Sequence, residues 1–179
     1  EARKRLADAL ALRKELQEKD GIAASELDLA RLNLEDGRES ESESALRELA
    51  SRGHAEKMYD LESSARSLLA VILARLGKNK PAEEQIALAR GIVSRSQRKA
   101  SHFEVEIAAA LSAKAPSAAV AAQLDSIAAD AQHRGLITIE FQARLARAEV
   151  DRKSGAGTTR AAALQKDAES KGFLLIAQK

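Results

Sequence analysis

The stretch that decides the fold is GRESESESALRELASRG, residues 37–53, in which Glu and Ser alternate strictly over 39–44. Alternating polar residues give a β-strand no apolar face, whereas the dipole of a helix favours acidic side chains in its first turn. The apolar residues that follow at helical spacing are Ala45, Leu46, Leu49 and Ala50. A solvated acidic linker is the alternative interpretation. The pattern favours a helix over 39–52.

The composition is also typical of a helical protein and excludes several classes of site. Hydrophobic residues make up 45% of the chain but aromatic residues only 2%, with no Trp, which disfavours β-sheet. The absence of Cys excludes disulfides, thiolate catalysis and cysteine-based zinc sites. The net charge of +2 gives no field that by itself implies a nucleic acid or an anionic membrane as partner. No apolar run approaches about eighteen residues, so we expect no membrane insertion.

Glycines and prolines divide the chain into helical segments. One set of glycines follows segments whose last turn carries Lys or Arg, a pattern typical of helix C-termini. This set is Gly21, Gly53, Gly135 and Gly172. A second set of breaks lies at Gly37, 77–81, Pro116 and 155–157. Apolar residues recur at helical spacing between the breaks. The predicted helices cover 1–19, 22–36, 39–52, 55–76, 81–97, 99–114, 117–134, 136–153 and 158–171, with the start of another in FLLIAQK at the end of the chain.

The second set of breaks is periodic. Gly37, Gly77, Ala115 and Gly155 follow one another at steps of about 40, 38 and 40 residues, the range in which helix-pair solenoids repeat. The local sequence repeats as well, because LARLNLEDG resembles ILARLG and LARAEVDRKSG further along the chain. Repetition at this period indicates stacked helical hairpins. We therefore predict an all-α, right-handed α-solenoid of antiparallel helix pairs, about nine helices in a single domain over 1–179.

The repeats resemble those of the tetratricopeptide repeat family over nearly the whole chain. The residues that carry the resemblance are Leu29, Ala30 and Gly37, then Leu69, Ala70, Gly77 and Ala82, then Leu145, Ala146 and Gly155. They match the family's large, small and turn-glycine positions of the first helix and its small residue early in the second. The period is nearer forty than the family's 34, and Leu, Ile and Ala replace most of its aromatic residues. These departures are similar to the divergent repeats of bacterial regulatory proteins.

The resemblance implies a concave face, lined by the first helix of each pair, that binds a peptide or protein partner. Transferring the family's groove positions to this sequence gives Arg31, Glu35, Ser64, Ser67, Arg75, His102, Ser112, Glu140, Arg147 and Asp151. The arginines among them are suited to gripping carboxylates with two parallel hydrogen bonds. Ordinary exposed side chains are the alternative for each position. The family's clamp of paired Lys and Asn for a C-terminal carboxylate is not reproduced.

No sequence motif completes a catalytic, metal or cofactor site. His102-Phe103-Glu104 is incomplete as a zinc motif without Cys, and Asp130-x-x-His133 has no further ligands from a partner helix. The stretch 155–159 lacks the spacing and lysine of a phosphate loop, so a turn is the better interpretation. SRSQRK, residues 94–99, has acids interspersed around it and little aromatic surface for stacking, so we expect no direct nucleic-acid binding. We predict no enzymatic activity, no cofactor and no metal.

The sequence thus predicts a noncatalytic protein-interaction module within a bacterial regulatory or signalling protein. The alternative is a structural module that spaces its parent protein or makes it oligomerise through the end helices. The chain starts without Met and already within a helical pattern, so we expect it to be part of a longer protein. A cytoplasmic location is expected, with the extracytoplasmic domain of a membrane-anchored protein as the alternative.

Overall fold

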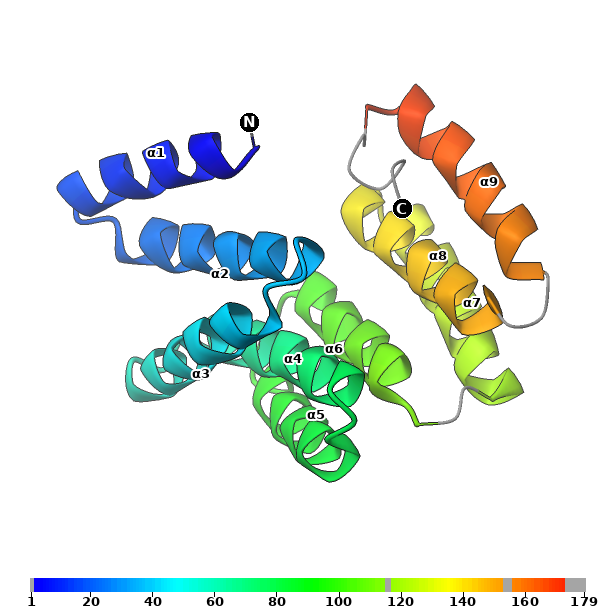
Figure 1. The fold of residues 1–179 in the computed structure, drawn as a ribbon, viewed down its shortest axis with the longest axis horizontal. Helices are drawn as coiled ribbons and strands as arrows, with labels where there is room; N and C mark the ends of the chain where they lie inside the picture. The colour runs from blue at the N-terminus through cyan, green and yellow to red at the C-terminus, as the bar shows by residue number, and fades with distance from the viewer. Residues whose placement is uncertain (1, 115–116, 153–155, 173–179) are drawn as a thin grey trace. The chain divides into compact units, whose positions relative to one another are not determined.

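The computed structural model describes residues 2–114, 117–152 and 156–172, without the side chains of Ala2, Glu35 and Ala156. Within these ranges the chain is all-α, with nine helices and no strand, as predicted. The helices are α1 (Ala2–Glu15), α2 (Lys19–Glu35), α3 (Glu39–Ala55), α4 (Tyr59–Arg75), α5 (Asn79–Val93), α6 (Lys99–Ser112), α7 (Ala118–His133), α8 (Ile137–Asp151) and α9 (Ala156–Ser170) (Figure 1).

The chain divides into two compact units. Unit 1 runs from Glu1 to Val105 and holds α1 to α5 with the first part of α6. Unit 2 runs from Glu106 to Lys179 and holds the rest of α6 with α7, α8 and α9. From α1 to α5 in unit 1, and from α7 to α9 in unit 2, each helix packs beside the next one in sequence, which is the packing of helical hairpins. The handedness and the single domain stay predictions.

Five turns between helices share one geometry. The second residue of each turn has a left-handed backbone conformation, and these residues are Gln17, Gly37, Lys57, Gly77 and Gly135. In the turn at Gly37, the Gly37 N–H donates to Leu34 O (3.3 Å) and the Arg38 N–H donates to Asn33 O (2.8 Å). The turn at Lys57 has the same pair of hydrogen bonds, which satisfies the last carbonyl groups of the preceding helix. The first four turns lie 20 residues apart, so each helix pair takes 40 residues.

Two of the predicted helix ends are wrong. Gly21 lies inside α2 and Gly53 lies inside α3, whereas these helices were expected to begin after Gly21 and to end before Gly53. At Gly53 the reason is the packing of α3 on α4: a Cβ atom on Gly53 would lie 2.9 Å from the backbone nitrogen of Glu62. The glycine therefore allows a close approach of two helices instead of ending one.

Other helix boundaries differ from prediction by a few residues. The predicted helix over 55–76 begins later, at Tyr59, because the turn around Lys57 separates it from α3. The predicted helix over 81–97 ends at Val93, and 94–98 form a longer connection to α6. The predicted breaks at Ala115, Pro116 and Gly155, and the segment FLLIAQK, lie outside the described residues.

Helix α4 is the centre of unit 1. It packs against α2, α3 and α5, and most of its side chains are buried. Leu69, Ala70 and Ile72 are at most 2% exposed, and Leu46 of α3 is fully buried. In unit 2, α8 has the same position between α7 and α9, with Phe141 buried against Leu164 and Ala168 of α9. Small residues at the crossings let these helices approach closely.

Candidate functional site

A hollow of about 660 Å³ opens on unit 1, lined by alternate helices. Helices α2, α4 and α6 contribute its sides, and the turn at 57–58 and the connection 95–98 close its edges. Its polar lining includes four acidic and four basic side chains: Asp20, Asp28, Asp60 and Glu104, and Arg31, Lys57, Arg95 and Arg98. The formal charges of these eight groups cancel, so the arrangement of the ion pairs decides where charge is left uncompensated.

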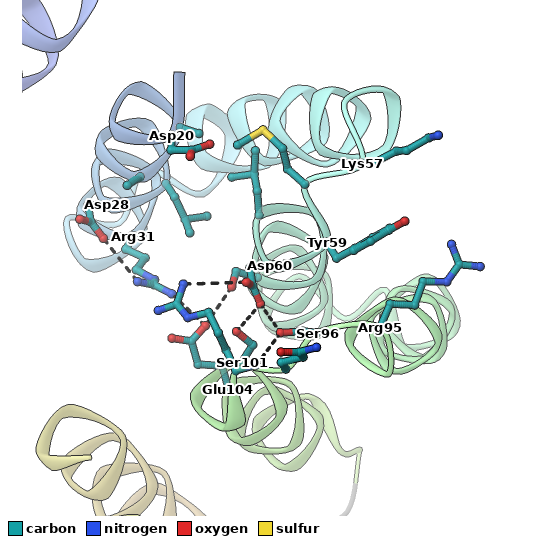
Figure 2. Close-up of a pocket in the computed structure, with 18 residues that line it drawn as sticks. Asp20, Asp28, Arg31, Lys57, Tyr59, Asp60, Arg95, Ser96, Ser101 and Glu104 are labelled. Atoms are coloured by element: carbon teal, nitrogen blue, oxygen red, sulfur yellow. Dashed lines mark hydrogen bonds and ion pairs between the residues drawn. The ribbon is translucent and has the colours of Figure 1, made fainter. Parts of the chain in front are cut away.

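Asp60, in the first turn of α4, holds the connection 94–98 and the start of α6 in place. Its Oδ1 accepts hydrogen bonds from the hydroxyl groups of Ser96 and Ser101, both at 2.6 Å (Figure 2). The Arg98 guanidinium lies 3.9 Å from Oδ2. His102 Nε2 donates to the Ser96 carbonyl oxygen at 3.0 Å. Asp60 is thus occupied by donors of its own chain.

Glu104 of α6 joins the other two helices of the hollow. Its Oε2 accepts from the Ser64 hydroxyl of α4 at 2.9 Å and from Arg31 Nη2 of α2 at 3.5 Å. Arg31 Nη1 also donates to Asp28 Oδ1 at 3.3 Å. The structure therefore brings together two predicted residues, Arg31 and Ser64, through a carboxylate that was not predicted. Charge reversal at Arg31 would break this intrahelical and interhelical network as well as any contact with a partner.

One edge of the hollow carries cations without carboxylate partners. Arg95 lies over the ring of Tyr59, 5.6 Å from its centroid, and forms no ion pair among the described residues. Lys57, in the turn before α4, is exposed and likewise forms no ion pair there. Figure 2 shows the side chains of Lys57, Tyr59 and Arg95 pointing to the same side, away from Asp60 and Glu104. We call these three residues the cationic edge.

The remaining predicted residues of unit 1 and α6 are not part of the lining. Arg75 is exposed at the end of α4 and has no ion pair among the described residues. Ser67 is 3% exposed, and its hydroxyl has no hydrogen-bond partner in the described part of the chain. Ser112 is buried and donates to Ala108 O of its own helix at 2.7 Å. The side chain of Glu35 lies outside the described residues.

The predicted residues of unit 2 belong to two ion-pair clusters. Glu140 is 5% exposed and accepts from Arg144 at 3.1 Å. Arg147 donates through Nε to Asp125 Oδ2 at 3.1 Å and pairs through Nη1 with Asp151. The hydrogen bond that Arg147 donates to Asp151 is the main reason that the pKa of Arg147 is raised. Arg147 was expected to bind the carboxylate of a partner, and in the structure it binds two carboxylates of its own chain.

Asp60, Glu104 and the cationic edge are not among the partner-binding residues predicted from the sequence. Asp60 and Ser101 are 41 residues apart, and their contact depends on how α6 packs on α4, which local periodicity does not report. A signal was present in the segment SRSQRK, which supplies Ser96 and Arg95. The segment falls within the predicted helices 81–97 and 99–114, but most of it forms the connection between α5 and α6.

Among the described residues no group of three or more His, Asp or Glu is placed to hold a metal ion. No helix in the described part of the chain is long and apolar enough to cross a bilayer. Comparison with known proteins found no matching family model, no matching curated protein and no matching solved structure.

Proposed function

We propose that the chain is a noncatalytic protein-interaction module whose hollow on unit 1 receives a peptide segment of a partner protein. The observation that carries the proposal is the hollow itself, built by α2, α4 and α6 with its polar groups already held in place. Preorganised polar groups lower the entropic cost of binding, because fewer side chains must be ordered when the ligand arrives.

The positions that resemble the tetratricopeptide repeat support this proposal. Ala30, Ala70 and Ala82 are at most 1% exposed, as expected for small residues at helix crossings. Gly37 and Gly77 have left-handed backbone conformations at the turns between paired helices. We accordingly propose that the chain consists of divergent repeats of this type and belongs to a bacterial regulatory or signalling protein with a cytoplasmic location.

A random-peptide display selection on the purified chain tests the proposal. Ala24 lines the hollow from α2 and is exposed, so Ala24→Trp fills the hollow without entering the core. Ala87, exposed on α5 and outside the lining, provides the matched control Ala87→Trp. We expect selected peptides to bind the wild type and Ala87→Trp but to lose binding to Ala24→Trp. Failure to select any peptide that distinguishes the two variants would contradict the proposal.

Self-association is the second candidate function, and exposed leucines favour it. Leu12 and Leu16 at the end of α1 are 55% and 60% exposed and lie four residues apart. Light scattering of the same preparations from dilute to concentrated solution distinguishes the two candidates. A mass that rises with concentration, and falls back to that of the single chain in Leu12→Lys, supports association through α1; a constant monomer mass excludes it.

A further inference from the structure

We propose that the cationic edge of Lys57, Tyr59 and Arg95 binds an acidic side chain, Asp or Glu, of the partner peptide. This inference rests on the proposed function, because it assigns the chemistry of the segment that enters the hollow.

The ion pairs inside the hollow leave an excess of positive charge on this edge. Asp60 and Glu104 accept from hydroxyl and guanidinium groups of the chain itself, and Asp28 pairs with Arg31. Lys57 and Arg95 have no carboxylate partner among the described residues. Among the acidic residues of the lining, only Asp20 likewise has no ion pair with a described residue. Lys57 and Arg95 are therefore the cations to which a carboxylate can add without displacing an existing ion pair.

Arg95 is held in a geometry suited to an anion. Its guanidinium lies over the Tyr59 ring, 5.6 Å from the ring centroid, and is attracted to the ring as in a cation–π contact. A guanidinium held against a ring in this way loses less freedom when it donates to a carboxylate, because its position is already restricted. Tyr59 thus acts as a positioning residue for Arg95.

Lys57 stands at a turn position whose backbone conformation favours glycine. It has φ 57° in a turn whose equivalents at Gly37, Gly77 and Gly135 are glycines, and a left-handed conformation is strained for a lysine. The only equivalent turn with another non-glycine residue, among those described, has Gln17, which does not line the hollow. A strained residue that lines a polar hollow points to a role in binding.

The chain offers a matched pair of variants for the test. Lys57→Gly removes the cation and the strain together, whereas Gln17→Gly removes only the strain. Both variants should raise the melting temperature. The probes are two fluorescently labelled peptides of equal length, one of alternating Glu and Ala and the other of alternating Gln and Ala, with binding followed by anisotropy.

We expect the Glu peptide to bind the wild type and Gln17→Gly equally, and to bind Lys57→Gly and Arg95→Gln about two- to fivefold more weakly each. Binding should weaken as salt rises, and the Gln peptide should bind no better to the wild type than to Lys57→Gly. Equal binding of the Glu peptide to wild type and Lys57→Gly, or no measurable binding to the wild type, would overturn the inference.

The display selection separates this inference from the proposed function. One outcome is that the selected peptides lose binding to Ala24→Trp without being enriched in Asp and Glu. That result would overturn the inference of an acidic peptide, while the hollow would remain a binding site. The control for the edge variant Lys57→Glu/Arg95→Glu is Lys80→Glu/Lys166→Glu, which has the same net charge and changes two exposed residues outside the lining. Acidic peptides that bind the control variant with unchanged affinity and lose affinity for the edge variant support the inference.

Discussion

Gly53 and Gly91 lie inside helices but have different surroundings. A Cβ atom on Gly53 would lie 2.9 Å from Glu62 N, whereas one on Gly91 would meet no atom within 4 Å. We expect Gly53→Ala to destabilise the chain by about 1–3 kcal/mol, because α3 and α4 must move apart. Gly91→Ala should stabilise it by about 0.5–1 kcal/mol, since alanine loses less backbone entropy in a helix. Urea denaturation measures both, and a shift in the same direction would contradict the close approach.

A glycine in the sequence predicts a helix end at some positions of this chain and not at others. Gly37, Gly77 and Gly135 end helices as their pattern predicts, because these turns need a left-handed residue and glycine adopts that conformation without strain. Gly53 follows a cation in the same way but serves helix packing, and local sequence does not distinguish the two uses. Conversely, the turn between α3 and α4 has Lys57 at its left-handed position instead of glycine, so the sequence did not reveal this turn.

At the scale of elements, one ion-pair cluster holds three helices of unit 2 together. Arg147 of α8 pairs with Asp125 of α7 and with Asp151, and Arg160 of α9 pairs with both acids at 3.8 and 3.2 Å. The Arg147 side chain is 12% exposed. We expect Arg147→Ala to cost about 2 kcal/mol, because the two acids then lose a partly buried partner.

Arg75→Ala is the control for Arg147→Ala, because Arg75 is exposed and has no ion pair among the described residues. It should change the free energy of unfolding by less than about 0.5 kcal/mol. Denaturation of both variants, followed by circular dichroism, measures the difference. Equal effects would mean that the cluster around Arg147 contributes nothing to stability and leaves Arg147 free for a partner.

The helices that build the site were predictable, but the contacts within it were not. Amphipathic stripes place Arg31 and Ser64 on α2 and α4, and both line the hollow. Asp60 bonds to Ser96 and Ser101 across 36 and 41 residues, and these bonds exist only because α6 packs beside α4. Periodicity gives the face of a helix and not its neighbour, so the partners of a polar residue stay unknown until the helices are packed.

At the scale of the whole molecule, each unit contains a half-buried carboxylate that is paired with basic side chains in the native state. In unit 1 the pKa of Glu43 lies below its usual value of 4.5, chiefly because Arg47 donates a hydrogen bond to it, with Lys78 nearby. In unit 2 the pKa of Asp167 lies below its usual 3.8, chiefly because of the hydrogen bond from Arg144, with Lys171 adding to it. Each carboxylate binds its proton more weakly in the folded chain than in the unfolded one.

The direction of the pH dependence follows from these two shifts. Stability from a carboxylate with a lowered pKa is fully present above its unfolded value and is lost as the pH falls through its folded value. We therefore expect the free energy of unfolding to fall as the pH drops below about 4.5 for Glu43 and about 3.8 for Asp167.

Glu43→Gln and Asp167→Asn should each be less stable than the wild type near neutral pH and lose less stability on acidification. Urea denaturation across this pH range measures the slopes, with Glu84→Gln, an exposed acid without an ion pair among the described residues, as the control. Parallel slopes for Glu43→Gln, Asp167→Asn and the control would show that the two ion pairs do not link folding to protonation in either unit.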